Sequence, residues 1–435
     1  MQELQVFNEN NNNEIPKAIL VNAVFRGEDR ESAEISLDEL ERLLETAGGE
    51  CVARLTQYKT APEAATYIGS GKLEELKELC ANNGASLVVF DTELSPSQIR
   101  NIEKEINSED TDIVVLDRSM LILDIFALHA KTGEGKLQVE LALLKYTIPR
   151  LTGKGLQLSR QGGGIGTRGP GESKLESDRR HLKRRMDALE NELEILEKNR
   201  SIQRKQRDKS GLFKIAIAGY TNAGKSTFLN YLTNAGILAE NKLFATLDPT
   251  TRKYTLPSGN DILLTDTVGF IRNLPHHLIK AFKSTLDEVA YSDAVLVMID
   301  ASESECYSQL EVTEKLLEEL GATGKPILYV YNKCDVESDA LPKLKQGAGE
   351  NNLFFISAKT GEGIDKLIDR MEELANDGKT TEIFMFPHAD QGQANVLYKS
   401  AVVLDTEYLA EGVKIKATVD SKVKGILSKY LVKES

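Results

Sequence analysis

Long apolar runs are absent from this sequence. No run approaches the roughly 18 residues that a membrane-spanning helix needs. The first residues, MQELQVFNENNNNEIP, are polar and do not look like a secretory signal. We therefore expect a protein that neither crosses a membrane nor enters the secretory route.

Residue types that bind zinc or form disulfides are also few. The four cysteines include no CxxC pair, and the five histidines follow no metal-ligand spacing. This scarcity argues against a zinc site and against a disulfide framework. It favours a cytoplasmic location, where thiols stay reduced. The cysteines are Cys51, Cys80, Cys306 and Cys334.

The composition that remains is that of a folded protein with several domains. A chain of 435 residues predicts about three or four domains. Its 41 % hydrophobic and 28 % charged residues argue against wholesale disorder. After a polar segment (1–14), which we expect to be a flexible N-terminus, residues 15–130 alternate apolar and helical patterns. This alternation predicts an α/β domain with a mainly parallel sheet. The expected strands are 17–25, 51–57, 86–91 and 112–117, and the expected helices are 36–49, 71–84 and 95–106.

Charge is distributed unevenly along the chain. The whole sequence carries a net charge of −13, which by itself argues against a polyanionic partner such as RNA. Residues 145–209, however, hold 17 Lys and Arg against nine Asp and Glu, a local net of +8. The other 370 residues therefore carry −21. The sequence describes an acidic protein with one basic segment.

That basic segment lies within residues 131–210, which predict a helical arm. Apolar residues recur at 4-3-4 spacing from Leu137 to Ile148 and at 7-4-3-4-3 spacing from Leu175 to Leu196, as in coiled-coil seams. Between them lies a basic, glycine-rich loop (150–175) that cannot be continuous helix. We expect two antiparallel helices with this loop at their tip; the alternative is a flexible linker.

Two further domains are expected after the arm. Residues 211–376 return to an α/β pattern, and residues 381–435 predict a small α+β domain. Within the small domain, the patterns predict strands over 381–387, 395–405 and 412–420, followed by a helix over 421–431.

The strongest motif is a phosphate-binding loop at residues 214–232. A buried strand leads into Gly219-x-x-x-x-Gly224-Lys225-Ser226, and a helical pattern follows. Glycines let the backbone N–H groups of such a loop point at phosphate oxygens, helped by the helix N-terminus. Lys225 would reach the β- and γ-phosphates, and the Ser226 hydroxyl would bind Mg²⁺.

Three later motifs select guanine and complete the site. Asp266-Thr267-Val268-Gly269 ends a strand, where Asp266 can hold the metal through water and the Gly269 N–H can reach the γ-phosphate. Asn332-Lys333-Cys334-Asp335 follows another buried strand, and Asp335 can accept two hydrogen bonds that adenine cannot donate. Ser357-Ala358-Lys359 places the Ala358 N–H near guanine O6. In this order the motifs predict GTP as the ligand.

A switch segment is expected between the phosphate loop and Asp266. The stretch 243–252, LFATLDPTTR, contains three hydroxyls, Thr246, Thr250 and Thr251, that could complete Mg²⁺ coordination when the γ-phosphate is present. Spacing alone does not choose among them.

With these motifs in order, the chain resembles the HflX family of translation-factor-related GTPases. The resemblance rests on GYTNAGKST, FATLDPT, DTVGFI and NKCD, on YIGSGKLEEL (67–76) and on the glycine-rich stretch 150–176, and it covers most of the chain. It implies a cytoplasmic, partly ribosome-associated GTPase that binds the large ribosomal subunit and its RNA. The sequence does not settle the oligomeric state, and a monomer is the default expectation. Members are reported to split stalled or idle ribosomes under stress. The implied fold is a multidomain α/β protein with a helical arm, a P-loop GTPase domain of mixed, mostly parallel sheet, and a small α+β C-terminal domain.

The resemblance also implies roles for single residues. It transfers the switch threonine that binds Mg²⁺ to Thr246, and it makes Asn222 a hypothetical ligand of K⁺. With Lys225 and Gly269 from the motifs, Thr246 completes the set of expected catalytic residues. Where many related enzymes place a water-orienting glutamine, this chain has Phe270 and Ile271, which predicts slow hydrolysis that a partner accelerates. The expected GTP-binding residues are Gly219, Tyr220, Thr221, Asn222, Ala223, Gly224, Lys225, Ser226, Thr227, Phe244, Ala245, Thr246, Leu247, Asp248, Asp266, Thr267, Val268, Gly269, Asn332, Lys333, Cys334, Asp335, Ser357, Ala358 and Lys359.

The basic residues of the arm are candidate RNA contacts. They would bind phosphates in a salt-dependent way, and the loop, which has no aromatic residue, would not stack on bases. For residues 186–200 we favour a solvated helix face instead. The alternative function is a GTP-gated adaptor whose hydrolysis times release of a protein partner. The candidate RNA-binding residues are Arg150, Lys154, Arg160, Arg168, Lys174, Arg179, Arg180, Lys183, Arg184 and Arg185.

Two glycine-rich stretches carry weaker signals. Residues 164–169 satisfy GxGxxG, but no strand precedes them, so they do not predict a dinucleotide site. Gly69-Ser70-Gly71-Lys72 resembles half a phosphate loop; we expect Ser70 to cap a helix there, and a second nucleotide site is the alternative.

Overall fold

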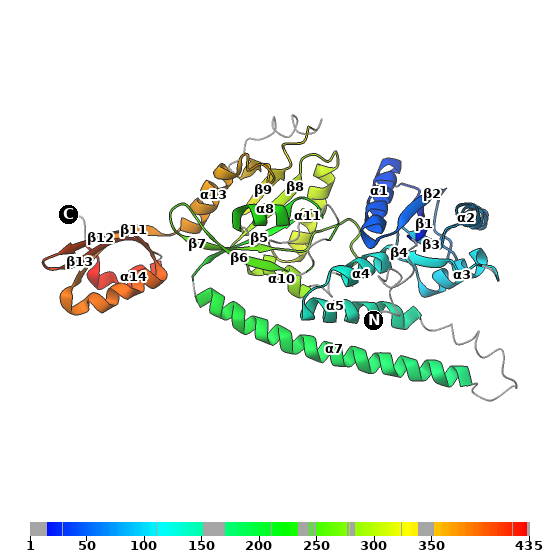
Figure 1. Cartoon of the computed structure of the whole chain (residues 1–435), viewed down its shortest axis with the longest axis horizontal. Coiled ribbons are helices and arrows are strands. Elements are labelled where there is room, and N and C mark those ends of the chain that lie inside the picture. Colours follow the sequence, from blue (N-terminus) through cyan, green and yellow to red (C-terminus); the bar gives the residue numbers. More distant parts are fainter. Residues whose placement is uncertain are drawn as a thin grey trace. The chain divides into compact units, whose positions relative to one another are not determined.

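The computed structural model describes most of the chain, which divides into two compact units. One unit comprises residues 1–198, 238–249 and 268–287, and the other comprises 199–237, 250–267 and 288–435. Figure 1 labels the elements. The described residues are 15–27, 29–109, 111–150, 170–209, 211–233, 243–244, 247, 249–275, 278, 283–322, 324–337, 352–419 and 421–432.

The first unit contains a four-stranded sheet in which every neighbouring pair is parallel. Its order is β2-β1-β3-β4. The alternation of apolar and helical patterns therefore predicted the right class of sheet, and each predicted strand lies within two residues of its observed bounds. The elements are β1 (Lys17–Phe25), α1 (Arg30–Ala47), β2 (Glu50–Lys59), α2 (Ser70–Asn83), β3 (Leu87–Phe90), α3 (Pro96–Ile106), β4 (Val114–Asp117) and α4 (Arg118–His129).

Capping residues explain where the predicted helix bounds were wrong. Helix α1 begins six residues before the expected start because the Asp29 carboxylate accepts the Ser32 N–H at 3.3 Å. Helix α2 begins after Gly69, and no side chain caps it, so the expectation that Ser70 is the cap was wrong. Helix α3 matches its prediction, with a capping box between Ser95 and Gln98.

Helix α4 has no counterpart among the predicted elements. Its sequence, RSMLILDIFALH, is mostly apolar, and residues 118–126 are all buried, the polar Arg118, Ser119 and Asp124 included. A helix with no polar face shows no 3.6-residue period, which is why its pattern gave no signal.

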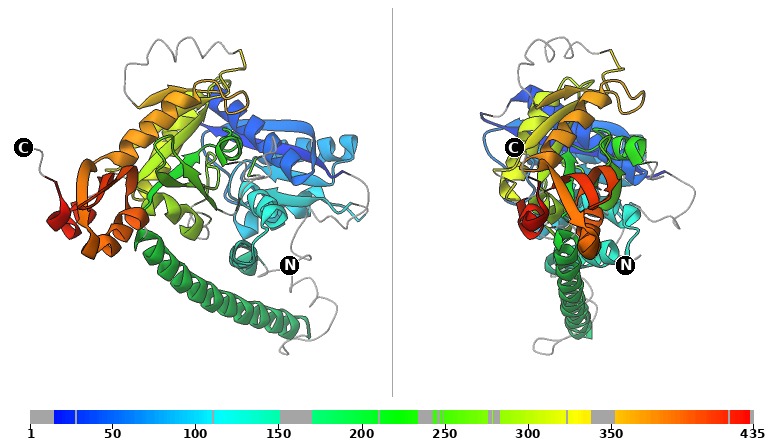
Figure 2. Two further views of the ribbon diagram at one scale, coloured as in Figure 1. Left: turned by 60° about the vertical axis from the view of Figure 1, so that its left-hand side comes forward. Right: turned by 90° about the vertical axis from the view of Figure 1, so that its left-hand side faces the viewer.

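In the part of the arm that the structure describes, the elements are α5 (Gly133–Thr147), the 3-10 turn η2 (Ile148–Arg150) and α7 (Pro170–Lys209). Helix α7 is unbroken in both views of Figure 2. Leu141 and Leu144 of α5 bury Leu189 of α7 completely, and Leu137, Ile148, Leu182, Met186 and Leu193 pack around them. These are residues of the two predicted seams, which shows that the apolar spacing identified the contact face of each helix.

The second unit contains a six-stranded sheet with order β10-β9-β8-β5-β7-β6. All pairs are parallel except β6 with β7. The mixed, mostly parallel sheet expected of a P-loop GTPase domain is confirmed. The elements are β5 (Phe213–Gly219), α8 (Lys225–Thr233), β6 (Thr250–Thr255), β7 (Asp261–Asp266), α10 (Lys283–Tyr291), β8 (Ala294–Asp300), α11 (Cys306–Glu319), β9 (Ile327–Asn332), β10 (Leu353–Phe355) and α13 (Ile364–Asn376).

The C-terminal residues form a separate antiparallel sheet with order β11-β13-β12. The predicted strand over 395–405 was wrong in its first half, because residues 395–400 form helix α14 before β12 begins. The apolar residues Ala394, Leu397 and Ala401 recur at helical 3-4 spacing and pack into one cluster, which explains the helix. The elements are β11 (Thr380–Pro387), η3 (His388–Ala394), α14 (Asn395–Ser400), β12 (Val402–Leu409), β13 (Gly412–Val419), α15 (Ser421–Ile426) and η4 (Ser428–Tyr430).

Candidate nucleotide-binding site

The phosphate loop connects the end of β5 to the start of α8. Lys225, the first residue of α8, is 6 % exposed, and its Nζ donates to the carbonyls of Gly219 at 3.2 Å and Tyr220 at 2.7 Å. Burial lowers the pKa of Lys225 to about 8, against the opposing effect of the Asp266 carboxylate. A phosphate group in this loop would supply the negative charge that favours the protonated form of Lys225.

Gly224 brings the phosphate loop close to the Asn332 motif. Its φ is +94°, in the left-handed region, and an added Cβ would clash with Asn332 Nδ2. Only glycine allows this approach without strain. The second glycine of the motif therefore lets the phosphate loop touch a segment that lies more than 100 residues later in the chain.

Ser226, an expected Mg²⁺ ligand, lies beside Asp266, which is expected to hold the ion through water. Ser226 Oγ donates to Asp266 Oδ2 at 2.6 Å, and Asp266 is fully buried at the end of β7. Hydroxyl and carboxylate oxygens are the ligands that Mg²⁺ prefers, so the pair fits this ion. Among the described residues no group of three or more His, Cys, Asp or Glu could hold a metal ion.

Thr267 has a structural position beside this pair. Its N–H and its hydroxyl both donate to the Ile217 carbonyl, at 3.2 and 2.8 Å, and the residue is fully buried. This pairing attaches the chain after β7 to β5. Thr267 thus aligns the strand ends, and its own hydroxyl is directed at protein.

Asn332 connects three of the sequence motifs. Its Nδ2 donates to the Ala223 carbonyl at 2.9 Å, and its Oδ1 accepts the Ala358 N–H at 2.8 Å. Asp335 is exposed at the same end of β9, so its carboxylate is accessible to an incoming base. The structure therefore brings the phosphate loop, the Asn332–Asp335 motif and the Ser357–Lys359 motif to the C-terminal edge of one sheet, where open α/β sheets bind ligands.

Two residues that the motifs did not include support this end of the site. Asp300, at the end of β8, forms an ion pair with Lys333 at 2.6 Å, and Lys333 has a left-handed φ of +63°. Tyr231 of α8 lies against the turn after Ser357, because a Cβ added at Gly361 would clash with its ring and hydroxyl. The only signal for Asp300 was its place at the end of a buried strand, and Tyr231 had none.

The remaining switch candidates are divided between the units. In the second unit, Thr251 Oγ1 lies 2.9 Å from Thr265 Oγ1 within the β6–β7 ladder, and Thr250 opens β6 opposite Asp266. Ala245, Thr246 and Asp248 lie outside the described residues. The first unit contains Phe244 and Leu247 of this segment and the Val268-Gly269 pair, all of them buried.

In the first unit, the N-terminal domain contacts both switch segments. Phe244 packs edge-on against Phe126 of α4, with ring centroids 4.7 Å apart, and the Leu243 N–H donates to Thr46 Oγ1 of α1 at 3.3 Å. Arg118 donates to the Arg272 carbonyl at 3.2 Å. The two residues after Gly269, Phe270 and Ile271, are apolar and buried. Sequence reasoning missed these contacts, since 154 positions separate Arg118 from Arg272.

The basic candidates of the arm have different surroundings. Four of them are exposed on α7, namely Arg179, Arg180, Lys183 and Arg184, which we call the basic face. Arg185 instead pairs with Glu140 of α5 through two hydrogen bonds, of 2.7 and 2.8 Å. Arg150 is turned into the N-terminal domain, as described below. The side chain of Lys174 and all of Lys154, Arg160 and Arg168 lie outside the described residues.

Known proteins similar to this chain agree with the motifs. Family models match in chain order: "GTP-binding GTPase N-terminal" over residues 34–127, "GTP-binding GTPase Middle Region" over 129–207 and "50S ribosome-binding GTPase" over 214–333. In the part of the chain that the structure describes, no helix is long and apolar enough to span a membrane.

Curated relatives match over nearly the whole chain. The GTPase HflX of Caldanaerobacter subterraneus is 48 % identical over 96 % of this chain and 94 % of the relative. That of Lacrimispora saccharolytica is 48 % identical over 94 % and 95 %. That of Escherichia coli is 39 % identical over 91 % of each. With the phosphate loop and the guanine motifs assembled on one sheet edge, the chain belongs to the HflX family of GTPases, which hydrolyse GTP to GDP and phosphate.

Proposed function

We propose that this GTPase binds the large ribosomal subunit through the RNA-facing side of its arm and dissociates or rescues ribosomes under stress. The observation that carries the proposal is the exposed basic face of α7 on a chain whose remaining charge is strongly negative. A cytoplasmic, ribosome-associated protein with this charge distribution would bind RNA at one surface and avoid it elsewhere. The matching model described as "50S ribosome-binding GTPase" supports the same partner.

In the proposed cycle, the residues of the candidate site have separate tasks. Lys225 and the phosphate-loop amides bind the β- and γ-phosphates, and Asp335 selects guanine. The Ala358 N–H, which donates to Asn332 Oδ1 in the structure, turns to guanine O6 when the base binds. Ser226 and Thr246 bind Mg²⁺, which neutralises phosphate charge, and Asp266 acts through water. Asn222, which has a left-handed φ of +61°, helps to bind K⁺. Turnover of an Asn222→Ala variant that keeps its dependence on K⁺ would contradict this last role.

Hydrolysis is proposed to be slow until a partner orders the switches. Phe270 and Ile271 are apolar and buried, so neither can orient the attacking water. The N-terminal domain touches the backbone of both switch segments through Thr46 and Arg118. A ribosomal subunit that shifts this domain would therefore reach the switch segments.

A matched pair of variants on α7 tests the proposed partner. Arg179→Gln with Lys183→Gln removes two charges from the basic face, and Lys198→Gln with Arg200→Gln removes the same two residue types further along the helix. The first pair should weaken binding to purified large subunits at least tenfold and reduce its salt dependence, and the second should leave both nearly unchanged. Equal effects of the two pairs would reject a specific basic face.

A second candidate, a GTP-gated adaptor, has one observation in its favour. The contacts of Phe126, Thr46 and Arg118 with the switch segments give the N-terminal domain a means of responding to the nucleotide. In that case a protein partner would bind the N-terminal domain in a GTP-dependent way. The α7 variants separate the two functions, because an adaptor would keep its activity when the basic face is neutralised.

A further inference from the structure

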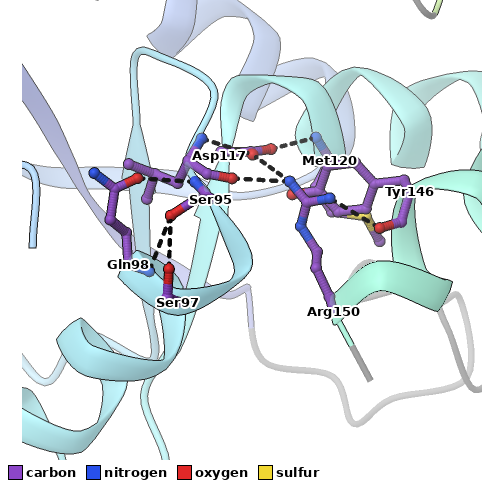
Figure 3. A network of polar contacts seen from close by, with 8 residues as sticks. Ser95, Ser97, Gln98, Asp117, Met120, Tyr146 and Arg150 are labelled. Atoms are coloured by element: carbon purple, nitrogen blue, oxygen red, sulfur yellow. Dashed lines mark hydrogen bonds and ion pairs between the residues drawn. The ribbon is translucent and has the colours of Figure 1, made fainter. Parts of the chain in front are cut away.

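One buried carboxylate joins the N-terminal sheet to the arm (Figure 3). Asp117 ends β4 and is fully buried. Its Oδ1 accepts the Met120 N–H at 2.9 Å, and its Oδ2 accepts the Leu94 N–H at 3.1 Å. The first bond caps α4, and the second holds the chain just before α3. Two segments of the domain therefore depend on this carboxylate.

Arg150 contacts this cluster from the end of the arm. Its Nη2 donates to Asp117 Oδ2 at 3.3 Å and to the Leu94 carbonyl at 2.9 Å, while Nη1 donates to the Tyr146 carbonyl at 2.8 Å. The guanidinium carbon lies 3.3 Å from the centroid of the Tyr146 ring, so the two planar groups are in contact. The side chain is only 18 % exposed.

The charges within the cluster compensate each other. Burial raises the pKa of Asp117, and the Tyr146 hydroxyl and the Arg150 charge both act to lower it. Arg150 is thus the counter-charge that makes a buried carboxylate tolerable at this position. Tyr146 contributes its ring to Arg150 and its hydroxyl to Asp117.

This arrangement differs from that of the basic face. The donors of Arg150 are directed at Leu94, Asp117 and Tyr146, whereas Arg179 and Lys183 are exposed on α7. An arginine that grips RNA phosphate needs its forked donors for the phosphate oxygens. In the structure Nη1 and Nη2 already have protein acceptors, and Nε is buried without one among the described residues.

The position of Arg150 also matters for α7. Arg150 follows α5 by three residues, and α5 packs against α7 through Leu141, Leu144 and Leu189. A contact that fixes the end of α5 on the N-terminal domain therefore fixes α7 with it.

We propose that Arg150 is a positioning residue of the arm and makes no contact with RNA. It fastens the end of α5 to the N-terminal domain and so sets the place of the basic face. This inference rests on the proposed function, because a fixed place for that face matters when it docks on the large ribosomal subunit.

Arg150→Lys separates a positioning role from an RNA contact. Lysine keeps the charge for a phosphate but cannot form the fork or stack on Tyr146. We expect Arg150→Lys to bind subunits about tenfold more weakly and to show faster amide exchange in the last turn of α5. Its GTP affinity should be unchanged, and so should its salt slope, the slope of log affinity for subunits against log salt concentration. Arg179→Lys, the matched control, should bind almost normally, and Arg179→Gln should reduce the salt slope by about 0.7–0.9.

Tyr146→Phe provides a milder test in case Arg150→Lys folds poorly. It keeps the ring under the guanidinium and loses only the hydroxyl that Asp117 accepts, so a smaller fall in affinity with an unchanged salt slope is expected. Normal subunit affinity together with normal α5 exchange in either variant would overturn the inference. If the unchanged protein bound subunits without salt dependence, the proposed function itself would fail, and the inference with it.

Discussion

Two buried cations, one in each unit, have opposite surroundings. Arg118 is 2 % exposed and lies between the carboxylates of Asp91 and Glu39, with the Arg272 carbonyl as a further acceptor. Lys225 is 6 % exposed, and its hydrogen bonds go to two backbone carbonyls. Burial disfavours the charged form of Lys225, whereas two protein carboxylates compensate the charge of Arg118. The difference indicates that a buried charge left for a ligand to neutralise marks a binding site, and a fully paired one marks a structural link.

The largest effect is expected from breaking the paired cation. Arg118→Met leaves Asp91 and Glu39 without their shared partner and should lower the free energy of unfolding by about 3–5 kcal/mol. Arg54 is a matched control, since it also joins two carboxylates, Asp38 and Glu41, but is 37 % exposed. Arg54→Met should cost less than about 1 kcal/mol. Urea unfolding curves measure both, and equal losses would contradict the distinction between buried and exposed pairs.

Replacing Lys225, to which no carboxylate of the described residues is hydrogen-bonded, should raise rather than lower the free energy of unfolding of the nucleotide-free protein. Lys225→Met removes the charge that the phosphates need, so GTP affinity should fall by roughly 100-fold or more, about 3 kcal/mol. The same change removes a buried charge whose pKa lies near 8, so the nucleotide-free protein should be stabilised by up to about 3 kcal/mol. Nucleotide titration and thermal unfolding without nucleotide check the two signs. A variant that loses both affinity and stability would show that Lys225 is structural.

A smaller effect is expected where the guanine end of the site is supported. Gly361 has a φ of +89°, and an added Cβ would clash with Tyr231. Gly361→Ala should weaken GTP binding by about 1–3 kcal/mol, because the turn that carries Ala358 must move. Gly259→Ala is the control for backbone strain alone, since Gly259 has nearly the same φ, +87°, with nothing near its added Cβ. If both variants bind GTP equally well, Tyr231 does not support the turn.

The smallest effect is expected at the exposed pair between α5 and α7. Arg185 is 47 % exposed and hydrogen-bonds Glu140 twice. Arg185→Gln should lower the free energy of unfolding by less than about 1 kcal/mol. Urea unfolding measures it, and a loss near that of Arg118→Met would contradict the ranking by burial.

The meeting of the nucleotide motifs at one sheet edge could be predicted because each motif is local in sequence. Gly224, Lys225 and Ser226 are consecutive, and the motifs of Asp266 and Asn332 each follow an apolar strand, so parallel-sheet geometry predicts that they meet. The support from Tyr231 and Asp300 could not be predicted in the same way. It depends on which side chains face each other after folding, and no spacing along the chain encodes that.

The arm shows the same limit more clearly. The leucine spacing predicted which residues of α5 and α7 touch, because a helical period is a local property. Net charge and spacing put Arg150 with the other basic residues, yet its acceptors lie 33 and 56 positions earlier, at Asp117 and Leu94. The helix over residues 395–400 was missed because β-type residues around it dominated the pattern, and packing of Leu397 decided the conformation.

The proposed function is tested most directly by single-turnover GTP hydrolysis with and without purified large ribosomal subunits. We predict slow hydrolysis by the protein alone, since Phe270 and Ile271 cannot orient water, and an acceleration of at least tenfold by the subunits. The Arg179→Gln, Lys183→Gln pair should reduce that acceleration. Hydrolysis that is equally fast with and without subunits would contradict the proposed function.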